Sequence, residues 1–411
     1  MSKLAINGGT KVRNKPWTKW PIFDNAERKG LNEVLESGKW WYGAKVKQFE
    51  AEYANFHDAK YAVSCTNGTA ALEIALIALG IGAGDEVIIP PYTFVATATA
   101  VLKVNAIPVF VDVNEDTWCL DEKLIEKAIT KKTKAIAPVH FGGLPADMDK
   151  INKLAKKYNL KVLEDACHSW GSKWKGKGTG ALGDMGAFSF QASKNINSGE
   201  GGIILSDNKD YADLARSYSN CGRLLDKPWY AHYILGGNYR LTEFQAAILL
   251  AQLSRLGKHT STREANAAYL NEKLGDLPGI KLTKRDKRVT RRSYHLYNFR
   301  YVEKELGGVP REKFIAAMAA EGLGISGGYP HPLYKNPLFL TKGTGAKHCP
   351  ISCPYYGKKV DYSKVKCDVT ERICYKEGAW FGHTVLLGNK QDMKDVVTIF
   401  EKVIGNINEL K

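Results

Sequence analysis

The chain has 411 residues, of which 44% are hydrophobic and 25% are charged. This composition is typical of a globular protein long enough for two or more domains. No stretch approaches the roughly 18 uninterrupted apolar residues of a membrane-spanning helix, and residues 1–17 lack the pattern of a secretory signal. We therefore predict a soluble, cytoplasmic protein with no membrane partner, whose net charge of +16 favours contact with anions.

The basic residues are densest at positions 281–292, KLTKRDKRVTRR, with seven basic residues and one acidic residue. A charge run of this kind is usually a solvated face. No aromatic residue interleaves with these charges, and nothing in the chain matches a helix-turn-helix pattern. We therefore predict no nucleic-acid partner.

Eight cysteines are too few for a disulfide framework in a chain of this length, and they fit a reducing compartment. Four of them lie between Cys349 and Cys374. A CxxxC pair followed by widely spaced single cysteines does not match the CxxC pairs of zinc folds. We therefore expect no bound metal.

Short apolar runs alternate with helical patterns from residue 60 to residue 206. The strand-like runs are YAVSC, DEVIIPP, NAIPVFVDV, KAIAPVHF, LKVLEDA, GAFSF and GGIILS. They are nearly continuous and rich in Val, Ile and Phe, as strands buried on both faces are. The alternation predicts an α/β fold with a mainly parallel sheet between helices, and in such sheets ligands bind at the carboxyl ends of the strands.

Two long helical patterns follow residue 206, and between them residues 221–238 are rich in aromatic, glycine and basic residues. We interpret this stretch as a functional loop. The predicted buried face of the second helix consists of Leu241, Phe244, Ala247 and Ile248. We place a large domain at residues 1–258, including the N-terminal segment, and a smaller α+β domain at residues 259–411.

Polar residues stand where two of the predicted strands end. Asn67-Gly68-Thr69 ends one strand and opens a helix, where free N–H groups favour a phosphate, although a plain helix cap explains this motif equally well on its own. Asp165 ends a second strand, with His168 three residues further on. An unpaired carboxylate at such a place is costly, so Asp165 needs a cationic partner.

The run FSFQASKNINSGEGG, residues 188–202, ends a third strand and carries Ser189 and Lys194. Most lysines that follow a strand lie at the surface, but a desolvated lysine has a lowered pKa and forms Schiff bases. Pyridoxal 5'-phosphate (PLP) is held by three parts of this kind in one sheet. They are a group of free N–H groups at the start of a helix (a nest), an aspartate at the end of one strand and a lysine at the end of another. The nest takes the phosphate, Asp165 the pyridine nitrogen and Lys194 the aldehyde.

One glycine-rich motif lacks the strand and helix that a dinucleotide-binding site requires around it. Residues 178–183, GTGALG, satisfy the dinucleotide-binding pattern GxGxxG by letter. They precede a predicted strand and open no helix, whereas the dinucleotide motif follows a strand and opens a helix. We predict no dinucleotide site.

Further motifs extend over nearly the whole chain, namely NGTAALEIAL, PPYTFVATATA, VDV, HFGG, EDACHSWG, GDMGAFSFQASKN, GEGG, NYRLTEFQAAI and GYPHPLY. As a set they resemble the DegT/DnrJ/StrS family of PLP-dependent sugar aminotransferases. The resemblance implies the aspartate-aminotransferase-like fold (fold type I). In that fold a mainly parallel seven-stranded sheet lies between helices in the large domain, and a smaller α+β domain follows.

The resemblance also implies roles for eight residues. Lys194 and Asp165 are the implied catalytic residues, and the cofactor is also held by Gly68, Thr69, Phe94, His168, Ser189 and Asn238. Phe94 is expected to stack on the cofactor ring, and His168 is expected near the ring oxygen. Asn238 resembles the residue that reaches the phosphate of the neighbouring subunit, which implies a homodimer with shared active sites.

The implied activity moves an amino group from L-glutamate or L-glutamine to a nucleotide-linked keto-sugar or a keto-cyclitol. Two half-reactions alternate the cofactor between PLP and pyridoxamine 5'-phosphate. The FQASKN and NSGEGG segments resemble the branch that acts on cyclitol ketones and aminobenzoate precursors. Residues 221–238 and 327–334 are expected to border the substrate. Tyr334 stands where family members often carry histidine.

Two alternatives stay open. One is a sugar dehydratase, although relatives with that activity replace the lysine with histidine and Lys194 is present here. The other is a non-catalytic PLP-binding regulator.

Overall fold

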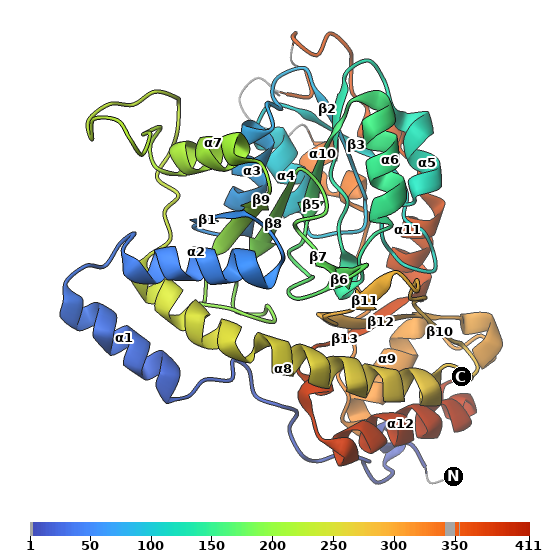
Figure 1. Ribbon diagram of the computed structural model, residues 1–411. Coiled ribbons are helices and arrows are strands. Elements are labelled where there is room, and N and C mark those ends of the chain that lie inside the picture. The colour runs from blue at the N-terminus through green and yellow to red at the C-terminus, as the bar shows by residue number, and fades with distance from the viewer. Residues whose placement is uncertain (1–2, 342–349, 353) are drawn as a thin grey trace.

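The computed structural model describes residues 3–341, 350–352 and 354–411, and Figure 1 shows how its elements are arranged. A seven-stranded sheet in the order β1-β9-β8-β5-β4-β2-β3 forms its centre. The strands are β1 (Tyr61–Cys65), β2 (Glu86–Ile89), β3 (Ile107–Phe110), β4 (Thr133–Ile136), β5 (Lys161–Asp165), β8 (Met185–Ser189) and β9 (Gly202–Ser206). β9 is antiparallel to β1 and β8, and the other pairs are parallel. The predicted α/β fold with a mainly parallel sheet is confirmed.

Helices cover both faces of this sheet because successive strand residues point to opposite sides. Val87 and Ile89 pack into one core with α3, α4 and α7, whereas Ile88 packs into another core with α5 and α6. Burial on both faces accounts for the nearly continuous apolar runs. The helices of this part are α1 (Asn25–Ser37), α2 (Ala44–Phe56), α3 (Gly68–Ala78), α4 (Ala96–Lys103), α5 (Glu122–Ala128), α6 (Met148–Tyr158) and α7 (Lys209–Ser219).

The long helix α8 (Glu243–Leu274) runs from α2 to the C-terminal part of the chain (Figure 1). The predicted boundary after residue 258 falls inside this helix, and the division into two domains stays a prediction. The predicted buried face of α8 was partly wrong, because Phe244 and Ile248 are only half-buried. The start of α8 is apolar nearly all round, so periodicity did not single out its inner face, which packs on α2 through Ala246, Leu249 and Leu253.

The C-terminal part has its own antiparallel sheet in the order β10-β12-β13. Its core is filled by residues of α8, α9 and α12, and the N-terminal Leu4 is buried in the same core. A third, small sheet β11-β6-β7 connects this part to the large sheet region. The elements are β6 (Lys173–Trp174), β7 (Lys177–Gly178), β10 (Ile280–Leu282), β11 (Val289–Arg291), β12 (Leu296–Tyr301), β13 (Gly378–Gly382), α9 (Arg311–Glu321), α10 (Pro337–Leu340), α11 (Asp368–Arg372) and α12 (Lys390–Gly405).

The GTGALG loop has a structural role. It lies between β7 and β8, and the fully buried carboxylate of Glu164 on β5 accepts hydrogen bonds from the N–H groups of Gly180, Leu182 and Gly183 at 2.6–2.7 Å. The same carboxylate lies 2.8 Å from Nε2 of the buried His140. The loop thus satisfies a buried charge instead of binding a dinucleotide.

Two of the sequence-based exclusions concern metals and membranes. Cys349 and Cys353 lie outside the described residues, and within the described ones there is no group of three or more His, Cys, Asp or Glu side chains placed to hold a metal ion. None of the described helices is both long and apolar enough to cross a membrane. The cytoplasmic location stays a prediction.

Candidate active site

A cavity of about 730 Å³ opens at the carboxyl ends of β1, β5 and β8. These three strands run in the same direction, so the residues that follow them meet at one edge of the sheet. Seven of the eight predicted site residues line this cavity: Gly68, Thr69, Phe94, Asp165, His168, Ser189 and Lys194.

The first element of the site is the start of α3. Asn67 caps the helix, with its Oδ1 atom accepting from the N–H of Ala70 at 2.8 Å. The N–H groups of Gly68 and Thr69 belong to the first turn and have no acceptor within the helix. A Cβ atom at position 68 would lie 2.6 Å from Cβ of Ser189. Only glycine therefore lets the helix start approach the Ser189 hydroxyl, and together they form a nest for an anion.

Asp165 is buried at the end of β5, and two donors hold its carboxylate. Its Oδ2 atom accepts from the hydroxyl of Thr97 at 2.7 Å, and its Oδ1 atom accepts from the N–H of Cys167 at 3.2 Å. The Thr97 hydroxyl lies in turn 3.1 Å from that of Thr93. Both threonines come from the PYTFVAT segment, so this segment orients the carboxylate toward the cavity.

Lys194 lies in the turn between β8 and β9. The turn is closed by bonds from the N–H of Lys194 to the carbonyl of Gln191 at 2.9 Å and from the N–H of Ser198 to the carbonyl of Phe190 at 3.0 Å. Burial lowers the pKa of the Lys194 ammonium, while Cys167 and Asp165 act in the opposite direction. The turn therefore presents an amine that loses its proton more readily than an exposed lysine does.

His168 lies beside Lys194 in the cavity wall. Burial, followed by the charge of Lys194, lowers the pKa of His168 well below its ordinary value, so the ring is neutral. Its Nδ1 atom accepts from the N–H of Gly142 at 3.4 Å. The ring proton therefore sits on Nε2, which can donate a hydrogen bond to a ligand.

Another part of the cavity wall comes from the C-terminal part of the chain, and sequence reasoning did not predict it residue by residue. It consists of His295, Leu296, Tyr329 and Trp380. These residues lie on three separate segments, of which only that of Tyr329 belongs to a motif found in the sequence, GYPHPLY. Thr97 was also missed, although its place one helical turn after Phe94 at the start of α4 was a usable signal.

Two expectations concern residues that do not line this cavity. Asn238 forms an isolated bridge with Asn220 outside it, and its predicted reach into a neighbouring subunit stays a prediction. Tyr334 was expected at the substrate edge, but its side chain is fully buried in the core around α3 and α4. Its hydroxyl donates to Glu371 at 2.8 Å and accepts from the N–H of Cys367 at 3.0 Å. Of residues 327–334, Tyr329 lines the cavity, and the expectation that this range borders the substrate stays a prediction.

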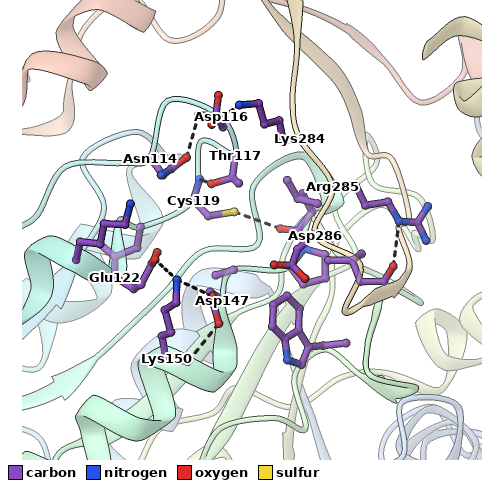
Figure 2. A pocket seen from close by; sticks show the side chains of 17 residues that line it. Asn114, Asp116, Thr117, Cys119, Glu122, Asp147, Lys150, Lys284, Arg285 and Asp286 are labelled. Carbon is purple, nitrogen blue, oxygen red and sulfur yellow. Dashed lines mark hydrogen bonds and ion pairs between the residues drawn. The ribbon is translucent and has the colours of Figure 1, made fainter. Parts of the chain in front are cut away.

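The basic run lines a second cavity, of about 390 Å³. Figure 2 shows that its charges are turned toward one another: Lys284 pairs with Asp116 at 2.9 Å, and Lys150 points between Glu122 and Asp147. Arg288 bridges further carboxylates, those of Asp147, Asp149 and Asp286. Lys281, Lys284, Arg285 and Lys287 are exposed, in agreement with the predicted solvated face, and several charges of the run also form ion pairs that join β11 to the large sheet region.

Comparison with known proteins agrees with this geometry. A model of the DegT/DnrJ/EryC1/StrS aminotransferase family matches residues 21–361. The chain belongs to this family. It is 37% identical to the L-glutamine:2-deoxy-scyllo-inosose aminotransferase of Micromonospora echinospora, and the match covers 100% of both chains.

Two solved structures resemble the chain in fold. The 3-amino-5-hydroxybenzoic acid synthase superposes with a TM-score of 0.86 at 33% identity, over 96% of this chain and 100% of the other. NtdA from Bacillus subtilis, solved with bound cofactor PMP, superposes with a TM-score of 0.80 at 27% identity, over 95% of this chain and 86% of the other. The protein is a PLP-dependent aminotransferase with the fold of this family.

The residues of this aminotransferase fit PLP. The nest at the start of α3 offers N–H groups and a hydroxyl to a phosphate, and the buried Asp165 carboxylate and the Lys194 amine face the same cavity. When bound, the cofactor supplies an electron sink for a carbanion next to nitrogen. Such a group needs an anion site, a carboxylate and an amine at separate ends, and the cavity holds all three.

Proposed function

We propose that the enzyme transfers the amino group of L-glutamine to a keto-cyclitol, an uncharged cyclic polyhydroxy ketone. The observation that carries this proposal is the charge of the cavity. Among the described residues that line it, the lysines are Lys103 and Lys194, and Lys103 is paired with Glu73 at 3.2 Å. A nucleotide-linked sugar brings two phosphate charges that call for cationic partners, whereas a cyclitol brings none. The activity in the name of the Micromonospora relative supports the same substrate class.

Each of the seven predicted site residues that line the cavity has one task in this reaction. Lys194 Nζ takes the proton from the donor carbon that bears the nitrogen. It would then deliver a proton to the carbon of the cofactor that receives the nitrogen. Asp165 keeps a proton on the ring nitrogen of the cofactor, which is what makes that carbon acidic. Gly68, Thr69 and Ser189 would hold the phosphate, Nε2–H of His168 would donate to the ring oxygen, and Phe94 would stack on the ring.

Atoms balance over two half-reactions. In the first, L-glutamine gives its amino group and one hydrogen to the enzyme, takes its new carbonyl oxygen from a water molecule and leaves as the 2-oxo acid. In the second, the ketone takes up that nitrogen, its oxygen leaves as water, and an amino-cyclitol is released. Lys194 acts once as a base and once as an acid in each half, so the enzyme ends each cycle in its starting protonation state.

The experiment offers the PLP-loaded enzyme L-glutamine labelled with ¹⁵N at the amino group, together with either 2-deoxy-scyllo-inosose or a nucleotide-linked keto-sugar. We expect ¹⁵N in the amino-cyclitol and a rate for the cyclitol at least about tenfold above that for the sugar nucleotide. The same panel with L-glutamate ranks the two donors. Loss of a hydroxyl from the ketone without transfer of nitrogen would instead identify a dehydratase, and absence of any turnover would favour a regulator.

We also infer a homodimer in which Asn238 completes the site of the partner subunit. Residues 220–242 form no helix or strand longer than an isolated bridge, and the segment projects from the body beyond α7 (Figure 1). It exposes large apolar side chains, with Trp229 71%, Tyr230 80% and Leu235 93% exposed. Exposed apolar groups of this size on one segment are typical of a surface that another chain covers.

Shared sites predict that two inactive variants rescue each other. In a mixed dimer of Asn238→Ala and Lys194→Ala subunits, one of the two sites receives both native residues. After the variants are unfolded and refolded together, random assortment should restore roughly a quarter of the wild-type activity. Either variant treated alone is the control. No recovery in a mixture that size-exclusion chromatography shows to be dimeric would refute the shared site, and a monomer in solution would refute the dimer.

A further inference from the structure

His295 belongs to the part of the cavity wall that the C-terminal part of the chain supplies. It directly precedes β12, its side chain is buried, and it lines the cavity beside Leu296, Tyr329 and Trp380. Its ring centroid lies 4.6 Å from that of His168. The wall therefore combines aromatic and aliphatic surface with a single imidazole.

The hydrogen bonds around Asn195 determine which nitrogen of His295 carries the proton. The side-chain nitrogen of Asn195 donates to the carbonyl of Ser293 at 3.1 Å, and a carbonyl only accepts, so the amide orientation is settled. The amide oxygen of Asn195 lies 3.0 Å from Nδ1 of His295, which must therefore be the donor. Asn195 follows Lys194 in the chain, so this pair also ties the lysine turn to β12.

A neutral imidazole with its proton on Nδ1 has a bare lone pair on Nε2. Burial lowers the pKa of His295 well below its ordinary value, and the charges that act on it next, those of His168, Lys194, His383 and Arg263, lower it too. The ring is thus neutral, and no hydrogen bond occupies Nε2 among the described residues. His168 presents the opposite arrangement, with its proton on Nε2.

We propose that Nε2 of His295 accepts a hydrogen bond from a ring hydroxyl of the ketone substrate. This bond favours polyhydroxy ketones over ketones that carry no hydroxyl group. The inference rests on the proposed keto-cyclitol substrate. The C–H faces of a cyclitol ring pack on Tyr329 and Trp380, while its hydroxyl groups need acceptors. On this wall the side-chain acceptors are Nε2 of His295 and the hydroxyl of Tyr329, whereas Leu296 and Trp380 have none.

Two substitutions separate the two nitrogens of the ring. In His295→Asn the amide can still donate to Asn195 in place of Nδ1, but nothing reaches the position of Nε2. In His295→Gln the longer side chain places an acceptor near the position of Nε2 and gives up the Nδ1 donor. Each variant is loaded with pyridoxamine 5'-phosphate, the cofactor form that meets the ketone in the second half-reaction. It is then titrated calorimetrically with 2-deoxy-scyllo-inosose and with cyclohexanone, which has the ring and the ketone but no hydroxyl group.

We expect His295→Asn to weaken the binding of 2-deoxy-scyllo-inosose about tenfold and that of cyclohexanone less than about twofold, because only the first loses a hydrogen bond. His295→Gln should recover most of the loss. Equal weakening of both ketones, or no weakening of the first, would overturn the assignment. The unaltered enzyme reports separately on the proposed function. If it neither binds 2-deoxy-scyllo-inosose nor aminates it, the proposed substrate class is wrong. If it binds this ketone and His295→Asn binds it equally well, only the role of His295 is refuted.

Discussion

Replacing Lys194 with alanine is expected to lower transamination by at least about a thousandfold, because a general acid–base group and a nucleophile are lost together. The variant should also lack the visible absorption band of lysine-bound PLP. Because burial lowers the pKa of the Lys194 ammonium, the neutral amine is present at lower pH than in an exposed lysine. Covalent attachment of PLP to the apoenzyme should therefore increase with pH and reach its midpoint below the ordinary lysine value.

The matched control is Lys103→Ala, which removes the other lysine among the described residues of the cavity. Lys103 is paired with Glu73 and lies on α4, outside the lysine turn. We expect this variant to keep the absorption band and most of the turnover. A Lys194→Ala enzyme that still transfers nitrogen at the wild-type rate, or a Lys103→Ala enzyme that loses the band, would contradict the assignment of the reactive amine.

Replacing Asp165 with asparagine is expected to lower the turnover number at least about a hundredfold while most of the PLP stays bound. The amide keeps the size of the side chain and can still accept from Thr97, which lies 2.7 Å away. It carries no negative charge, so it does not hold a proton on the ring nitrogen, and the electron sink is weakened. Turnover with saturating L-glutamine and the fraction of bound PLP after dialysis measure the two effects separately.

Thr97→Val serves as the comparison for this second prediction. It removes the hydroxyl that donates to Asp165 but leaves the charge in place, so the loss of turnover should be only about tenfold. Equal losses in Asp165→Asn and Thr97→Val would mean that orientation, and not charge, is what Asp165 supplies. Full turnover in Asp165→Asn would contradict the proposed mechanism outright.

The sequence by itself predicted the parts of the site that depend on neighbouring residues. Strand runs such as LKVLEDA and GAFSF are apolar because both faces of the sheet are covered, and each ends at the polar residue that enters the cavity. The Asn67 cap is likewise a local arrangement, decided by a side chain and the N–H three residues later. Parallel strands bring their carboxyl ends to one edge, so Asp165, Ser189 and Lys194 were expected together before any contact was known.

Pairings across long distances in the chain were decided only by the tertiary structure. Nothing near position 284 shows that Lys284 meets Asp116, so this ion pair was not predicted, although the exposure of the lysine was. Tyr334 lies in a motif that borders the site, yet its hydroxyl finds Glu371 and Cys367 in the core. His295 becomes a candidate substrate contact only because β12 packs against the lysine turn through Asn195. The sequence thus determined the cofactor side of the cavity, where signals are local and periodic, whereas the substrate side depends on which distant segments pack together.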